Sequence, residues 1–209
     1  MAELDIGAIV PSSRDALQAI ATHKKALAIV GAVAPEDGAA AARRLDDLGV
    51  RALASTASDA HMAAIAAATK SLPTICLAPV ATRDEALRAR SLGADAVCVA
   101  RGLDDASWSA VAEAIQATHM LAIATASDAG EIATSERRGA RAVLLTAPTT
   151  AGVLALAATK PRGVALLASP ADADLDALRT LFGHVDAVVV AAPLEDETGF
   201  GAFVPEVDP

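Results

Sequence analysis

Histidine and cysteine carry much of the catalytic and metal-binding chemistry of proteins near neutral pH, and both are scarce here. The chain of 209 residues has four histidines and two cysteines. The histidines do not pair at the spacing of metal ligands; they are His23, His61, His119 and His184. Cys76 and Cys98 lie within apolar runs (TICLA and AVCVA), where a free thiol behaves as a small hydrophobic residue. We therefore expect no metal site, no cofactor and no disulfide.

Hydroxyl side chains are the next candidates for chemistry, because several follow short apolar runs directly. Thr125, Thr146 and Ser169 each stand at the end of such a run, and Ser127 follows two residues after Thr125. Their hydroxyls can donate and accept hydrogen bonds to a small polar ligand. The alternative is that they bond the backbone or water at the ends of strands.

Charged side chains near these runs are fewer. Arg101 follows an apolar run and could hold a phosphate or a carboxylate. Alternatively, it pairs with Asp104 or Asp105 in the loop that follows. Asp128 is interpreted first as the cap of a helix and second as a base.

The elements that would position these residues form a regular series. Short apolar runs at intervals of roughly 20–25 residues have the continuous hydrophobicity of parallel strands covered on both faces. We predict eight strands, which are Ala26–Val33, Arg51–Ser55, Thr74–Ala78, Ala96–Ala100, Met120–Thr125, Ala142–Thr146, Val164–Ala168 and Ala187–Ala191.

Helix signals separate the strands. Carboxylates that can cap the first turn of a helix are Asp59, Asp104, Asp128 and Asp172. Glycines suited to a left-handed helix end before the next strand are Gly49, Gly93, Gly139 and Gly183. These glycines recur at intervals of 44, 46 and 44 residues, so the repeating unit is a pair of β/α units.

Four such pairs predict a single closed β/α barrel of eight parallel strands, the TIM-type fold. We expect a lead-in helix within 1–25, eight β/α units over 26–191 and an irregular acidic tail over 192–209. An open doubly wound sheet is the alternative. However, the turn after the first strand (GAVAPEDG) matches neither the G-x-G-x-x-G motif nor the Walker loop, the two glycine-rich motifs that bind phosphate. The glycines and prolines of the tail predict that the eighth helix is missing or irregular. Phe200, Phe203 and Val204, or a second chain, would then cover the exposed flank.

Composition excludes several classes of function. Hydrophobic residues make up 54% of the chain and charged residues 21%, which supports a large core. A net charge of −9 gives no electrostatic basis for binding nucleic acid or an anionic membrane. The chain lacks an apolar run long enough to span a membrane, and its start lacks the pattern of a signal peptide. We expect a cytoplasmic protein.

Three segments resemble the indole-3-glycerol phosphate synthase family, the barrel lyase of tryptophan biosynthesis. They are Leu72–Ala100 (LPTICLAPVATRDEALRARSLGADAVCVA), Ser12–Gly38 and His119–Ala147. The resemblance implies that the position of Leu77 is held in the family by a lysine, which acts as general acid. It likewise implies that the position of Thr125 is held by a glutamate, which is the partner of that lysine. All the family's catalytic positions are occupied by other residues here, namely Ile29, Gly31, Leu77, Thr125, Thr146 and Ala168. Ser169 matches a serine that contacts phosphate in the family.

These replacements predict that the chain has lost the catalytic lysine and glutamates and acts as an inactive binding or assembly partner. The ligand would be phosphorylated or indole-like, bound by Ser169, Thr146, Thr125, Ser127 and Arg101. A protein partner would be a tryptophan-pathway enzyme or a second copy of the chain. The alternatives are an active synthase or another phosphate-ligand barrel enzyme that uses displaced groups, and a sensor of a small ligand.

Overall fold

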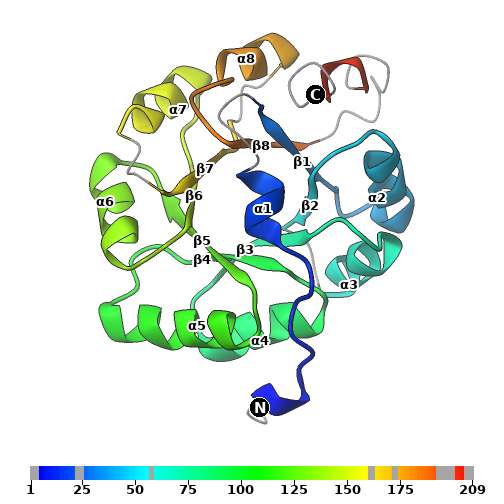
Figure 1. The fold of residues 1–209 in the computed structure, drawn as a ribbon, viewed down its shortest axis with the longest axis vertical. Helices are drawn as coiled ribbons and strands as arrows, with labels where there is room; N and C mark the ends of the chain where they lie inside the picture. Colours follow the sequence, from blue (N-terminus) through cyan, green and yellow to red (C-terminus); the bar gives the residue numbers. More distant parts are fainter. Residues whose placement is uncertain are drawn as a thin grey trace.

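The computed structural model describes residues 5–21, 26–56, 59–159, 163–170, 174–191 and 201–204. Eight parallel strands pair in chain order and close into a barrel, with the last strand beside the first (Figure 1). The strands are β1 (Ala28–Ala32), β2 (Ala52–Ser55), β3 (Thr74–Val80), β4 (Ala96–Val99), β5 (Leu121–Ala126), β6 (Ala142–Leu145), β7 (Ala165–Ala168) and β8 (Ala187–Ala191). The predicted TIM-type barrel is confirmed, and all eight predicted strands are present.

A ring of helices surrounds the barrel, one after each of the first seven strands. They are α2 (Gly38–Asp47), α3 (Asp59–Ala68), α4 (Arg83–Ser91), α5 (Asp105–Ala117), α6 (Ala129–Arg137), α7 (Thr150–Ala157) and α8 (Leu175–Thr180). The carboxylates of Asp104 and Asp128 cap α5 and α6 as predicted, each accepting from a backbone N–H three residues on. Asp172 lies outside the described residues, and Asp174 caps α8. Gly49, with φ of 84°, and the three other predicted glycines all take the left-handed conformation.

The described part of the tail lies where an eighth outer helix would stand. Residues 201–204 form a helical turn between α8 and α2 (Figure 1). Phe203 and Val204 are 1% and 3% exposed, and the Arg179 guanidinium lies 5.6 Å from the centre of the Phe203 ring. The prediction that the tail covers this flank is therefore confirmed for Phe203 and Val204, whereas Phe200 lies outside the described residues. None of the described helices is long and apolar enough to cross a membrane.

Two separate hydrophobic layers follow from the alternation of side chains along the strands. One layer lies between the strands and the outer helices and includes Ile29, Leu45 of α2 and Leu87 of α4. The other fills the barrel and includes Val30 and Leu167. The end of the barrel at which the strands begin is closed by α1 (Ala16–Ile20), which lies across the barrel in Figure 1. Helix α1 buries Ala16 and Ile20 against the residues inside the barrel. The lead-in helix thus plugs the end of the barrel at which the strands begin.

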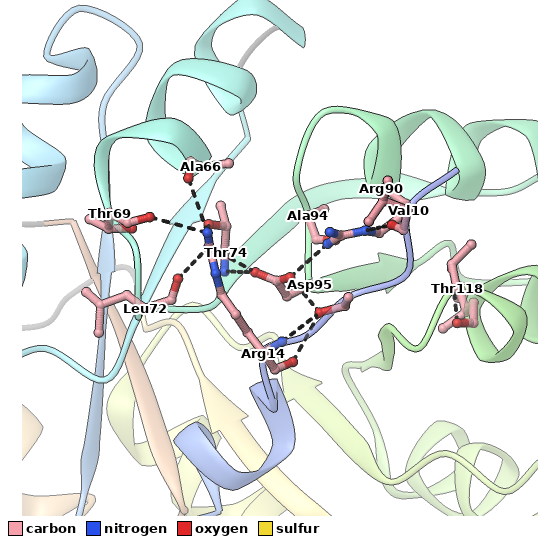
Figure 2. A network of polar contacts seen from close by, with 12 residues as sticks. Val10, Arg14, Ala66, Thr69, Leu72, Thr74, Arg90, Ala94, Asp95 and Thr118 are labelled. Atoms are coloured by element: carbon pink, nitrogen blue, oxygen red, sulfur yellow. Dashed lines mark hydrogen bonds and ion pairs between the residues drawn. The ribbon is translucent and has the colours of Figure 1, made fainter. Parts of the chain in front are cut away.

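A buried carboxylate holds this plug in place (Figure 2). Asp95, the residue before β4, is 2% exposed. It accepts hydrogen bonds from Ser12 Oγ at 2.6 Å, from Arg90 Nη1 at 2.8 Å and from the backbone N–H of Thr74 at 3.0 Å. Arg14 Nη1 lies 3.3 Å from Asp95 Oδ2, which also accepts from Thr74, and it donates to the Leu72 carbonyl at 2.7 Å. This network ties the segment before α1 to β3, β4 and the end of α3.

Candidate functional site

The carboxyl ends of the strands, which form the mouth of the barrel, are where barrel enzymes place their reacting groups. The side chains that face inward there follow from the alternation along each strand. In the described chain they are Ala32, Thr56, Leu77, Ala100, Thr125, Thr146, Ser169 and Ala191. None of these eight is ionisable, so acid–base chemistry would need a side chain from the surrounding loops.

Three of the hydroxyls predicted to bind a ligand lie at the ends of neighbouring strands. Thr125 lies within β5, whereas Thr146 and Ser169 directly follow β6 and β7. In the pairing register Thr125 lies opposite Leu144, two residues before Thr146. Thr125 Oγ1 donates to the Val99 carbonyl at 3.4 Å and Thr146 Oγ1 to the Ala126 carbonyl at 3.3 Å. Both bonds are long for a hydroxyl donor, so they compete poorly with a ligand that offers a better acceptor. Ser169 is exposed.

The positions taken from the synthase resemblance do not all face the mouth. Ile29 and Ala168 belong to the layer between strands and helices. A side chain at Gly31 would point the same way, because an added Cβ would lie 2.8 Å from Leu45 Cδ1 of α2. Leu77 faces inward. Three of the six mapped positions, Ile29, Gly31 and Ala168, therefore face the helices of this barrel and not its mouth.

Arg101 lies at the rim of the mouth. Its partner is Glu131 and not Asp104 or Asp105, the nearby carboxylates with which the sequence predicted a pair. Its Nε and Nη2 donate to Glu131 Oε1 of α6 at 3.0 and 2.7 Å, and Nη2 also donates to Ser127 Oγ at 2.8 Å. Asp104 is unavailable because it caps α5, and Asp105 pairs with Arg138 instead. The predicted pairing with Asp104 or Asp105 is therefore wrong.

Glu131 is the functional candidate that the sequence interpretation missed. Ser127 donates to Glu131 Oε2 through its backbone N–H at 2.7 Å and through its hydroxyl at 3.1 Å. Partial burial raises the pKa of the Glu131 carboxyl, but the hydrogen bonds from Ser127 and Arg101 outweigh it and hold the pKa below its usual value. The signal in the sequence was the spacing Asp128-x-x-Glu131, which is that of a helix cap followed by an acidic third residue.

A cleft of about 420 Å³ opens beside this cluster, between α5 and α6. Its lining includes Arg101, Thr125 and Glu131, together with Trp108 and Arg138 deeper between the helices. The Arg138 guanidinium lies 5.5 Å from the centre of the Trp108 ring. The cleft therefore connects the charged rim with one hydroxyl of the mouth.

None of the described histidines and cysteines lines the cleft beside the mouth. His61 is buried with Nε2 3.4 Å from the Val33 carbonyl, His119 and His184 are exposed, and His23 lies outside the described residues. Both cysteines are free thiols, and burial raises the pKa of Cys98 to about 12. Within the described ranges, no three histidine, cysteine, aspartate or glutamate side chains are grouped as metal ligands would be.

Comparison with known proteins finds similarity at the level of structure. No protein-family model and no curated protein matches the chain. A crystal structure of 2,3-dimethylmalate lyase, a member of the PEP mutase/isocitrate lyase superfamily, matches with a TM-score of 0.67 and 15% identity over 91% of this chain and 85% of that one. A crystal structure of 3-hexulose-6-phosphate synthase matches with a TM-score of 0.72 and 15% identity over 88% of this chain and all of that one (100%). The likeness is one of fold.

The assignment to the indole-3-glycerol phosphate synthase family is therefore wrong. The similar structures belong to other barrel families, and half of the mapped catalytic positions face the helices. Of the three segments that suggested the family, Leu72–Ala100 surrounds Gly93 and the start of β4. A left-handed glycine followed by an apolar strand is a common way to end a helix and begin a parallel strand, so such a phrase identifies the scaffold rather than the chemistry.

Proposed function

We propose that this barrel binds a small polyhydroxyl ligand in its mouth and carries out no acid–base chemistry on it. The observation that supports the proposal is the arc of hydroxyls at the ends of β5, β6 and β7, formed by Thr125, Thr146 and Ser169. Hydroxyls both donate and accept, which suits them to the hydroxyls of a sugar or polyol.

The charged groups near the mouth support binding rather than catalysis. General acid–base catalysis needs a group free to take or give a proton within hydrogen-bond reach of the reacting atom. Arg101 and Glu131 are bonded to each other, and Asp128 accepts the Glu131 backbone N–H as a helix cap. Each of these groups already serves the structure of the rim.

The ligand class is a sugar or a sugar phosphate. A phosphate would extend toward Ser169, because barrels often bind phosphate at the loops after their last two strands. The similar structure of 3-hexulose-6-phosphate synthase bears the name of a sugar-phosphate enzyme, which makes this class the first to test.

Calorimetric titration with hexoses, hexose 6-phosphates and inorganic phosphate tests the proposal. Thr146→Val and Ser169→Ala remove hydroxyls of the arc, and each is expected to weaken binding about tenfold, the usual effect of one lost hydrogen bond. Thr159→Val is the matched control, because its hydroxyl lies at the opposite end of the same β/α unit and bonds the Leu156 carbonyl.

We expect the bound sugar to be recovered unchanged after prolonged incubation. Equal affinity in Thr146→Val, Ser169→Ala and Thr159→Val would show that the arc does not bind the ligand. Conversion of the ligand, abolished by Thr146→Val, would show that the mouth is catalytic.

A further inference from the structure

The Glu131 carboxylate occupies a converging set of donors at the rim. Two N–H groups of the Arg101 guanidinium meet one of its oxygens, and the N–H and hydroxyl of Ser127 meet the other. Arg101 follows β4, Ser127 follows β5 and Glu131 lies in the first turn of α6. Two segments of the chain thus direct four hydrogen-bond donors at one carboxylate of a third.

The equivalent glutamate on α4 shows what an ordinary helix cap requires. Glu85 Oε2 accepts from the backbone N–H groups of Ala81 at 2.7 Å and Thr82 at 3.1 Å. Those two bonds complete the cap of α4. Glu131 has the same backbone bond to the residue four positions before it, and in addition a guanidinium and a hydroxyl. The additional donors exceed what capping needs.

A guanidinium fork beside a hydroxyl and a backbone N–H is the donor set with which proteins bind carboxylates and phosphates. We propose that Arg101 and Ser127 form an anion-binding site that the chain's own Glu131 carboxylate occupies in the absence of ligand. The ligand is a monoanionic or dianionic group, carboxylate or phosphate, that enters from the cleft between α5 and α6. This inference is independent of the hydroxyl arc and assigns a second group of contacts to the same mouth.

The position of Glu131 allows it to be displaced. Its side chain is 30% exposed and that of Arg101 is 47% exposed, so solvent reaches both partners. The cleft of about 420 Å³ is lined by both of them. Because the helix cap of α6 also rests on Asp128, rotation of the Glu131 side chain leaves the first turn of the helix capped.

Removal of the internal carboxylate is the direct test. In the Glu131→Ala protein, inorganic phosphate and acetate, titrated in separate NMR experiments, are expected to shift the amide signals of Arg101 and Ser127. We expect an affinity for at least one anion roughly tenfold or more above that of the wild type, since charge-assisted hydrogen bonds replace those of the glutamate. The stronger of the two anions identifies the ligand group.

Two further variants separate this explanation from a general effect of lost charge. Glu85→Ala removes the matched cap of α4 and the same negative charge, and its phosphate and acetate affinities are expected to stay at the wild-type level. In Glu131→Ala/Arg101→Ala the gained affinity is expected to disappear. Glu131→Gln keeps an acceptor for the Ser127 N–H while removing the charge, so it provides the same test if the alanine variant does not fold.

Equal anion affinities in folded Glu131→Ala and Glu85→Ala would overturn the proposal, as would a gain that survives the loss of Arg101. Neither result depends on sugar binding by Thr146 or Ser169. Failure of the anion site and failure of the hydroxyl arc are therefore separate outcomes.

Discussion

At the scale of single residues, two carboxylates with several hydrogen-bond partners each, Glu131 and Asp95, lie at opposite ends of the barrel. Glu131 is partly exposed at the mouth, where solvent can exchange its partners. Asp95 is buried at the other end between Arg14 and Arg90, whose side chains are 23% and 13% exposed. A carboxylate enclosed in this way is stabilised only while its partners remain, because a buried charge without partners is costly.

Asp95→Asn is accordingly expected to lower the free energy of unfolding by about 3 kcal/mol, since two guanidinium groups would lose their anion. Asp84→Asn is the control, because Asp84 pairs with Arg83 on the surface and both side chains are more than one-third exposed. That exposed pair is expected to contribute less than about 1 kcal/mol. Urea denaturation of the three proteins measures the difference, and similar midpoints for the two variants would contradict a stabilising role of the Asp95 network.

At the scale of elements, the outer surface of the barrel is covered in the described chain by the helices α2 to α8 and the helical turn at 201–204. The turn at 201–204 lies between α8 and α2 and buries Phe203 and Val204 there. The Arg179 guanidinium over the Phe203 ring closes the contact from the side of α8. The described turn of four residues thus buries apolar side chains at a place where a helix does so in the other units.

Phe203→Ala is expected to destabilise the protein by about 3 kcal/mol or more, because a fully buried aromatic side chain is lost and a cavity remains. Phe182→Ala is the matched control, since Phe182 is 42% exposed at the end of α8. It is expected to change stability by less than about 1 kcal/mol. Thermal unfolding followed by circular dichroism compares them, and a small effect of Phe203→Ala would mean that the turn does not seal the flank in solution.

At the scale of the whole molecule, the described surface has few apolar side chains free for association. The large hydrophobic residues exposed in the described ranges are Val10 and Phe182. Stable interfaces between identical subunits bury extensive apolar area, which two separate side chains do not supply. The flank that might have required a second chain is covered by the chain itself.

We therefore expect a monomer in solution. The sequence left open whether the tail or a second chain covers the flank, and in the structure Phe203 and Val204 of the tail are buried there. Size-exclusion chromatography with light scattering, over a wide range of protein concentration, measures the molar mass. A dimer that persists on dilution would show that residues outside the described ranges, or a polar surface, mediate association.

Much of the scaffold could be predicted because its signals are local. The near-continuous apolar runs determine strands, a glycine such as Gly93 marks a left-handed helix end, and Asp104 and Asp128 mark helix starts. The glycines and prolines after β8 likewise predicted an irregular tail, of which the structure describes the helical turn at 201–204. Each of these features depends on a few neighbouring residues, so it can be inferred without knowing the fold.

Tertiary structure alone decided which strand positions face inward and which charged groups meet. A shift of one residue moves a strand side chain from the interior to the helix layer, and for this reason Ile29 and Gly31, but not Val30, face the helices. Glu131 reaches Arg101 from 30 residues away, and Ser12 reaches Asp95 from 83. Partners so distant in sequence are chosen by the closure of the barrel, which no local pattern encodes.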